Sequence, residues 1–331
     1  MRCLVTSSRP YDREFLTNAN KGRHDLVFID TALREDTALL ARGFPSVCVF
    51  VDDNLSRGVI QILADGGTRV LLLRSTGFNH VDLRTAADCG VTVMRVTEYS
   101  PYAVAEFALA LILTLNRRVH KSYARVRDGN FLLDGLLGFD MHGKTVGLMG
   151  TGKIGTALAR ILHGMGCRLL GCDPVRNPVC ETLGLTYVSA DELLAESRVI
   201  SLHLPLTPDT YHFINSESIA RMPRGAILVN TSRGALVDTA ALIESLKNHH
   251  IGAVGLDVYE EEAALYFQNL ADEIIGDDLF SRLLTFPNVV VTGHQAFFTV
   301  EALQTIAETT MANLDDFAAG RTNANVVGCK G

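Results

Sequence analysis

Residues 145–155 read TVGLMGTGKIG and carry the most informative pattern of the chain. An apolar run leads into three glycines spaced as G-x-G-x-x-G, and residues 156–162 continue with the pattern of an amphipathic helix. In such a strand–turn–helix unit, Gly150 permits a tight turn, Gly152 lets the backbone approach a pyrophosphate, and Gly155 lets the helix pack on the strand. The start of the helix then offers N–H groups to the phosphates. The stretch therefore predicts a dinucleotide-binding unit.

A carboxylate follows the next predicted strand, where such a unit needs one. Residues 168–172 form an apolar run that ends at Asp173, eighteen residues after Gly155. An acidic side chain at this position accepts hydrogen bonds from the ribose hydroxyls of the adenosine and repels a 2′-phosphate. This favours NAD over NADP, although Arg176 nearby keeps the phosphorylated form as an alternative.

Short apolar runs alternate with helical patterns on both sides of this unit. Buried strands are predicted at residues 26–29, 47–51, 70–73 and 91–94 before it, and at 199–204, 226–229, 253–256 and 289–292 after it. Helical segments are predicted at residues 57–64, at 83–87, from Pro101 with Ser100 as N-cap, and at 300–317. This alternation is typical of α/β proteins with parallel sheets.

Length and composition exclude several classes of protein. The 331 residues fit two domains, and 47% apolar with 20% charged residues excludes a disordered chain. With 30 basic and 37 acidic residues the net charge is −7, so neither nucleic acid nor an anionic membrane is an expected partner. Seven cysteines without a C-x-x-C pair predict neither a disulfide framework nor a metal site. The apolar segment 103–115 is short for a membrane span. We expect a cytoplasmic protein that acts on a small molecule.

A basic run lies at the far end of the predicted helix that begins at Pro101. It contains Arg117, Arg118, His120 and Lys121. Two interpretations stay open. The run is either a solvated helix end or a surface that steers anions.

Three side chains that could carry chemistry each follow a predicted strand in the second half of the chain. Arg233 has a guanidinium fork that can bind a carboxylate through two hydrogen bonds. Glu262 belongs to an acidic run, residues 260–262, and His294 follows the last predicted strand. Each has an ordinary explanation by itself, as a surface ion pair, a solvated loop or a non-catalytic histidine. Because all three share one half with the glycine motif, one ligand crevice could collect them.

The chain resembles the D-isomer-specific 2-hydroxyacid dehydrogenase family, and within it the fermentative, lactate-forming branch. The motifs that carry the resemblance are residues 74–82, 99–101, 150–155, 203–207, 230–234, 257–262 and 293–294. The long segment 263–285 also resembles that branch. The resemblance implies two doubly wound parallel-sheet domains. A flavodoxin-like substrate domain, discontinuous and built from residues 1–99 and 299–331, encloses a Rossmann NAD-binding domain of residues 100–298.

The resemblance also implies roles for individual residues. Arg233 corresponds to the substrate-binding arginine, His294 to the acid/base, and Glu262 to its partner carboxylate, selected by the Glu-x-Glu spacing after Asp257. Cofactor contacts are implied at Gly150, Gly152, Lys153, Ile154, Gly155, Asp173, Pro205, Thr231 and Asp257. Further substrate contacts are implied at Thr76, Gly77 and Tyr99. Phe107 stands where close relatives have histidine, and we expect it to pack on the apolar stripe of its helix.

The implied activity is the reversible, NAD-dependent reduction of pyruvate to D-lactate in a homodimer or homotetramer. Two alternatives remain at this point. One is another 2-oxoacid reductase of the same family, acting on glyoxylate, hydroxypyruvate or a bulkier substrate. The other is a non-catalytic protein that senses NAD, against which the presence of Arg233, Glu262 and His294 argues.

Overall fold

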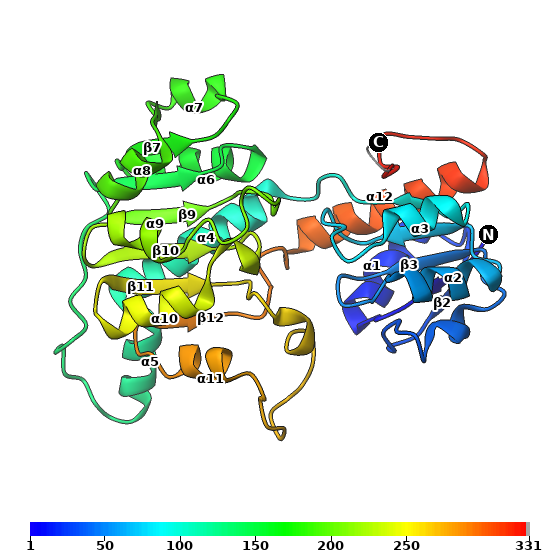
Figure 1. Ribbon diagram of the computed structural model, residues 1–331, viewed down its shortest axis with the longest axis horizontal. Coiled ribbons are helices and arrows are strands. Elements are labelled where there is room, and N and C mark those ends of the chain that lie inside the picture. Colours follow the sequence, from blue (N-terminus) through cyan, green and yellow to red (C-terminus); the bar gives the residue numbers. More distant parts are fainter. Residues whose placement is uncertain (329–331) are drawn as a thin grey trace. The chain divides into compact units, whose positions relative to one another are not determined.

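Two parallel sheets organise the chain, each inside its own compact unit (Figure 1). The computed structural model describes residues 1–328. Unit 1 consists of residues 1–100 together with the returning segment from residue 298 onward, and unit 2 consists of residues 101–297. The α/β fold class predicted from the alternation of strands and helices is confirmed.

Unit 1 is built on a five-stranded sheet. Its strands are β1 (Arg2–Val5), β2 (Asp25–Phe28), β3 (Ser46–Val49), β4 (Val70–Leu73) and β5 (Thr92–Met94). They lie in the order β2-β1-β3-β4-β5 and all pairs are parallel, which is the flavodoxin-like arrangement. Its helices are α1 (Pro10–Asn20), η1 (Ala38–Ala41), α2 (Arg57–Asp65), α3 (Leu83–Asp88) and α12 (Val300–Ala318).

Alternate residues of these strands face different helices, because side chains alternate across a strand. Val5 belongs to the core that contains Leu16 of α1 and Met311 of α12. Leu4 belongs to the core on the other face, with Ile60 of α2. The prediction of a buried strand at residues 26–29 is wrong in one respect, since β2 is only half-buried. It lies at the edge of the sheet, where one side has no neighbouring strand.

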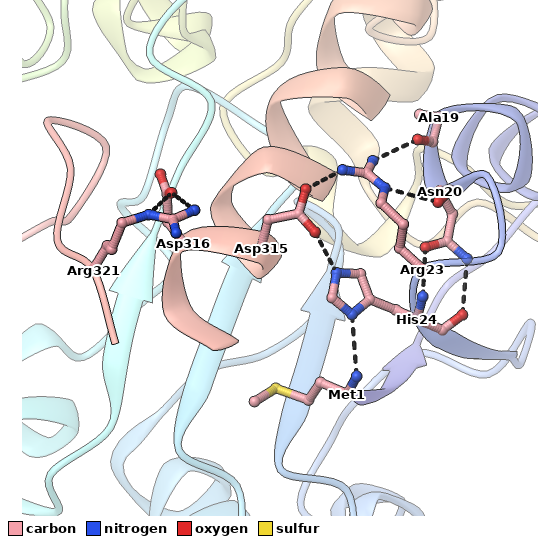
Figure 2. A network of polar contacts seen from close by, with 8 residues as sticks. All are labelled: Met1, Ala19, Asn20, Arg23, His24, Asp315, Asp316 and Arg321. Atoms are coloured by element: carbon pink, nitrogen blue, oxygen red, sulfur yellow. Dashed lines mark hydrogen bonds and ion pairs between the residues drawn. The ribbon is translucent and has the colours of Figure 1, made fainter. Parts of the chain in front are cut away.

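The returning helix α12 is tied to the first part of unit 1 by a polar network (Figure 2). Asp315 of α12 forms an ion pair with Arg23 and lies 2.7 Å from Nε2 of His24. Nδ1 of His24 in turn lies 3.1 Å from the amino group of Met1. One carboxylate therefore connects two ends of the chain that are almost 300 residues apart.

Unit 2 is built on a seven-stranded sheet. Its strands are β6 (Thr145–Met149), β7 (Arg168–Cys172), β8 (Thr186–Tyr187), β9 (Val199–Leu202), β10 (Ala226–Asn230), β11 (Ile251–Leu256) and β12 (Val289–Val291). They lie in the order β12-β11-β10-β9-β6-β7-β8, again all parallel. With β6 as the first strand, this is the dinucleotide-binding order, extended by a seventh strand. Its crevice forms where the order reverses, between β6 and β9.

The helices of unit 2 cover both faces of this sheet (Figure 1). They are α4 (Pro101–Arg117), α5 (Val119–Arg127), α6 (Lys153–Gly164), α7 (Pro178–Thr182), α8 (Ala190–Glu196), α9 (Ser216–Arg221), η2 (Gly234–Leu236), α10 (Thr239–Lys247), η3 (Glu262–Ala264) and α11 (Asp278–Leu284). The α4 helix begins at Pro101, as predicted, and buries Leu111 and Ile112 against Leu148 of β6. Phe107 packs against the same core, which confirms its expected role.

Within residues 1–328, no helix is long and apolar enough to cross a membrane. In the same part of the chain, no group of three His, Cys, Asp or Glu side chains is placed to hold a metal ion. The six cysteines from Cys3 to Cys180 are free thiols, whereas Cys329 lies outside the described residues.

Candidate active site

The three candidate catalytic side chains follow neighbouring strands of the seven-stranded sheet. Arg233 comes after β10, Glu262 after β11 and His294 after β12, and β11 pairs with both of the other strands. Because the strands are parallel, their carboxyl ends lie at one edge of the sheet, which is where open α/β sheets bind ligands.

Glu262 and His294 are in direct contact. The Glu262 Oε1 atom lies 2.8 Å from Nδ1 of His294. The second carboxylate oxygen accepts a hydrogen bond of 2.9 Å from the backbone N–H of Tyr259, so the carboxylate is held from two sides. A carboxylate at Nδ1 fixes the ring and leaves Nε2 as the nitrogen that can exchange a proton with a ligand. This is the arrangement of an orienting carboxylate behind a general acid/base.

The other two glutamates of the acidic run have different surroundings. Glu260 lies 2.5 Å from Nε2 of His212 and accepts a hydrogen bond of 3.1 Å from the hydroxyl of Thr239. Glu261 is exposed to solvent. Of the three carboxylates, Glu262 is thus the one that the chain places against His294.

Asp257 braces the loop that carries His294. Its side chain is completely buried and accepts hydrogen bonds from the Thr292 hydroxyl (2.6 Å) and from the backbone N–H groups of Gln295 (2.9 Å) and Ala296 (2.8 Å). The backbone of His294 has a φ of 53°, a conformation that non-glycine residues rarely adopt. Its N–H donates to the Asp257 carbonyl at 2.8 Å. The sequence predicted a cofactor contact at Asp257, whereas its carboxylate is committed here to the histidine loop.

The turn that presents Arg233 is braced in a similar way by Asn230. This fully buried side chain donates to the Arg233 carbonyl at 2.7 Å and accepts from the Ser232 N–H at 3.0 Å. Directly after the arginine, a Cβ atom on Gly234 would lie 2.0 Å from the carbonyl carbon of Tyr259. The Arg233 turn therefore packs, backbone against backbone, on the loop that leads to Glu262.

Sequence pattern does not indicate the roles of two bracing residues and one aromatic neighbour of the site. Asn230 is the last residue of β10, within the motif 230–234, and Thr292 directly follows β12, but neither the motif nor the position indicates a bracing role. The third is Phe267, whose ring centroid lies 5.9 Å from that of His294. It belongs to the long segment after Glu262, which has no periodic pattern from which this contact could be foreseen.

The glycine motif has the geometry that a dinucleotide requires. Gly150 has a φ of 95°, and a Cβ atom there would lie 2.5 Å from the His203 carbonyl oxygen. A Cβ on Gly155 would lie 2.1 Å from the Gly150 oxygen, so this position needs glycine for the helix to approach the strand. A Cβ on Gly152, in contrast, meets no atom of residues 1–328 within 4 Å. Contacts within the protein do not explain Gly152, whereas the approach of a pyrophosphate to the start of α6 does.

Other predicted cofactor positions surround the same edge of the sheet. Asp173 follows β7, and its carboxylate accepts hydrogen bonds from the N–H groups of Thr151 (2.7 Å) and Val175 (2.9 Å). Thr231 is buried at the end of β10, and its hydroxyl has no hydrogen-bond partner within the described residues. A buried hydroxyl without a partner is costly, and a polar ligand group would satisfy it. Lys153 and Pro205 are exposed, and Ile154 is half-buried against the core. These residues fit a bound NAD.

The predicted substrate-side residues belong to unit 1. Thr76 and Gly77 follow β4, at the carboxyl edge of the five-stranded sheet, and both are half-buried. The Thr76 carbonyl accepts a hydrogen bond of 2.9 Å from Arg95, and the Gly77 carbonyl accepts one of 2.8 Å from the Ser75 hydroxyl. Tyr99 is half-buried in the segment between β5 and α4. With these carbonyls occupied, the backbone N–H groups are what this loop can offer an anion.

Comparison with known proteins identifies the family. The family model "D-isomer specific 2-hydroxyacid dehydrogenase, NAD binding domain" matches residues 109–296. The chain is 49% identical over 328 residues to a 2-hydroxyacid dehydrogenase homolog of Haemophilus influenzae, covering 99% of both chains. It is 48% identical over 326 residues to the D-lactate dehydrogenase of Escherichia coli, covering 98% of this chain and 99% of that one. A solved structure described as the pyruvate reductase of Chlamydomonas reinhardtii is similar with a TM-score of 0.93, at 44% identity and 98% coverage of each chain.

The chain therefore belongs to the D-isomer-specific 2-hydroxyacid dehydrogenase family, as the motifs had indicated. It is an oxidoreductase whose cofactor is NAD, and its substrate is a small hydroxy or oxo acid.

Proposed function

We propose that this enzyme is a D-lactate dehydrogenase that reduces pyruvate to D-lactate. The observation that carries the proposal is the contact between Glu262 and His294, at the same sheet edge as the Arg233 turn and the glycine motif. The names of similar proteins support the substrate, since one is a D-lactate dehydrogenase and another a pyruvate reductase.

In this mechanism, bound NADH supplies the hydride that adds to the carbonyl carbon. Arg233 binds the substrate carboxylate through its guanidinium fork, and Thr76, Gly77 and Tyr99 complete the substrate contacts from the substrate domain, residues 1–99 and 299–331. Nε2 of His294 donates a proton to the carbonyl oxygen as negative charge grows there. Glu262 orients the ring and compensates the charge of the imidazolium. The NAD-binding domain, residues 100–298, holds the cofactor through Gly150, Gly152, Lys153, Ile154, Gly155, Asp173, Pro205 and Thr231, while Asp257 holds the loop of His294.

A comparison of steady-state rates tests the substrate. NADH oxidation is measured with pyruvate, glyoxylate, hydroxypyruvate and 2-oxoisocaproate, and the product of pyruvate reduction is resolved by chiral chromatography. We expect the highest kcat/KM with pyruvate and a product that is the D-isomer. A higher kcat/KM with another acid would identify a different reductase of the family, and no oxidation with any of them would identify a binding protein.

The proposed partner is a second copy of the chain. On α5 and in the segment after it, large apolar side chains are exposed on unit 2. These are Val119, Tyr123, Val126, Phe131, Leu132, Leu133 and Leu137. An exposed apolar patch of this kind is typical of a protein interface.

Size-exclusion chromatography with light scattering measures the molar mass of the protein in solution and so tests the oligomeric state. The variant Phe131→Asp/Leu133→Asp is expected to be monomeric where the wild-type protein is a dimer or tetramer. The control is Val175→Asp/Ile274→Asp, which places the same two charges on exposed apolar residues of unit 2 outside the patch. A wild-type monomer would contradict the proposal.

The proposed compartment is the cytoplasm. Six cysteines are free thiols, and Cys3, Cys48 and Cys180 among them are buried. Free thiols are characteristic of proteins in a reducing compartment. Localisation of the full chain with a fluorescent tag tests this proposal.

A further inference from the structure

One pocket of unit 2 lies at the edge of the seven-stranded sheet opposite to the candidate active site. It opens at Ile251 and Gly252, the first residues of β11, whereas Asp257 follows the last residue of that strand. A strand of this length spans about 17 Å, so the pocket is separate from the catalytic edge. Its volume is about 560 Å³, within the usual range for sites that bind small molecules.

The charged side chains that line this pocket are all basic. Four of them are arginine or lysine side chains, and the fifth is a histidine. They are Arg118, Lys121, Lys247, His249 and Arg282. No Asp or Glu lines it within the part of the chain that the structure describes. For a protein whose net charge is −7, such a gathering of positive charge is unusual.

Few of these charges are compensated by the protein itself. Lys247 pairs with Glu244 at 2.6 Å, an exposed contact of the kind that contributes little. Arg282 lies over the ring of Phe286, 5.0 Å from its centroid. Desolvation and the neighbouring charges of Arg118 and Arg125 lower the pKa of Lys121.

Two of the basic residues occupy backbone positions that favour glycine. Arg118, between α4 and α5, has a φ of 51°, and His249, just after α10, has a φ of 53°. At a position of this kind after a helix, glycine is the usual residue because it has no Cβ. The chain nevertheless carries a basic side chain at both, and both line the pocket. At His249 the backbone alone caps α10, since the N–H groups of His249 and His250 donate to the carbonyls of Leu246 and Ser245, so capping does not require the imidazole side chain.

We propose that this pocket binds a small polyvalent anion, one with at least two phosphate or carboxylate groups. Arg118, between α4 and α5, and Arg282 of α11 both line the pocket, and each guanidinium can bind one anionic group. Lys121 and Lys247 neutralise the remaining charge. This assigns a ligand to the basic run at residues 117–121, for which anion steering was one of two interpretations. The proposal is independent of the lactate dehydrogenase function, because none of the catalytic candidates lines the pocket.

Titration calorimetry tests the site on the full-length enzyme with saturating NADH, which keeps the probe out of the pyrophosphate position at Gly152. The probes are inorganic pyrophosphate, tricarballylate and inorganic phosphate, without divalent cations and at low ionic strength. We expect saturable binding of pyrophosphate or tricarballylate, whichever matches the natural anionic groups, and at least tenfold weaker binding of phosphate. No saturable binding of either polyvalent probe would overturn the proposal.

Two double variants distinguish anion binding in the pocket from a general effect of surface charge. Arg118→Gly/Arg282→Gln removes both arginine forks and is expected to weaken binding at least tenfold. The matched control, Arg168→Gln/Arg221→Gln, removes two exposed arginines of unit 2 that do not line the pocket, and it should bind as the wild type does. Equal weakening in both variants would overturn the proposal.

The single variant Arg118→Gly excludes a folding defect. Because glycine suits the backbone at this position, its Tm should equal or exceed that of the wild type while its anion affinity falls. A lower Tm with unchanged affinity would mean that Arg118 serves the fold and would contradict the assignment.

Discussion

At the scale of single residues, the active site depends on which polar atoms are already engaged within the chain. His294 has Glu262 on one ring nitrogen, so a proton can pass only through the other. Glu260, only two residues away, contacts a different histidine, His212. Neighbours in sequence thus acquire different roles because successive residues of the loop point in different directions.

The first prediction concerns His294 as the proton donor. The variant His294→Gln should lower kcat for pyruvate reduction by about 10²–10⁴-fold, the usual contribution of a positioned acid/base. NADH affinity, measured by fluorescence titration, should not change. The control is His212→Gln, which removes the other histidine that contacts a glutamate of the acidic run. Turnover unchanged in His294→Gln, or lowered equally in both variants, would refute the assignment.

The second prediction concerns the guanidinium of Arg233. Arg233→Lys keeps the charge but loses the fork, so KM for pyruvate should rise about 10- to 100-fold, while the affinity for NADH stays constant. Initial rates over a range of pyruvate concentrations measure the change. If the affinities for pyruvate and NADH fall by the same factor, the variant has a folding defect and Arg233 is not a specific carboxylate ligand.

The third prediction is a pH dependence of stability. Burial lowers the pKa of His203 from 6.5 to about 4, and its Nε2 lies 2.9 Å from the Ser201 hydroxyl. As the pH falls below 6.5, the unfolded chain therefore takes up a proton that the folded chain does not. The contribution of His203 to the free energy of unfolding is complete above pH 6.5 and decreases as the pH falls toward 4.

Urea unfolding at pH 8 and pH 5 measures this contribution. Between these values the wild type should lose about 2 kcal/mol more than His203→Asn, which cannot titrate but can still contact Ser201. Equal losses of unfolding free energy in the wild type and the variant would show that His203 does not cause the pH dependence.

At the scale of elements, the site depends on loops packed against each other at the ends of parallel strands. Gly234 shows how tight this packing is, since the backbone of the Arg233 turn meets the backbone of Tyr259 with no space for a side chain. Asp257, at the end of β11, similarly holds the loop after β12 through three hydrogen bonds. The strands determine where each loop begins, and the contacts between loops determine the positions of the catalytic side chains.

The fourth prediction tests this packing. In Gly234→Ala the new Cβ would overlap the Tyr259 backbone, so we expect a loss of about 1–3 kcal/mol in the free energy of unfolding and a higher KM for pyruvate. The control is Gly164→Ala at the end of α6, where a Cβ meets no atom of residues 1–328 within 4 Å. That variant should have wild-type kinetics and equal or greater stability. If the two variants have the same free energy of unfolding and the same KM for pyruvate, the close backbone approach at Gly234 does not support the site.

At the scale of the whole molecule, each unit has cores of its own on both faces of its own sheet. The chain passes between the units only near residues 100 and 298. All three candidate catalytic side chains and the glycine motif belong to unit 2, while Thr76, Gly77 and Tyr99 belong to unit 1.

The fifth prediction follows from this division. A protein consisting of residues 101–297 should fold and bind NADH with nearly the affinity of the full chain, because unit 2 contains the complete dinucleotide-binding sheet. It should not reduce pyruvate at a measurable rate, because it lacks the proposed substrate loop. Circular dichroism, NADH fluorescence and pyruvate-dependent NADH oxidation provide the three measurements. Substantial pyruvate reduction by this fragment would contradict a substrate role for unit 1.

Much of this protein could be predicted from sequence because the relevant signals are local. The glycine spacing of residues 150–155, the period of the apolar residues in strands and helices, and Pro101 at a helix start act within a few residues, so they can be recognised without coordinates. The motifs also identified the family. Local pattern could not show that β2 is a half-buried edge strand, because strand order is a property of the sheet.

The contact between Glu262 and His294 agrees with the family motif, whereas other contacts depend on tertiary structure alone. The fold committed the Asp257 carboxylate to the histidine loop and placed Arg118 and Arg282 in one basic pocket. Each of these contacts joins segments from different strand–helix units, and such contacts depend on strand order and loop packing. Spacing along the chain carries no information about them, because residues far apart in sequence become neighbours only when the sheet forms.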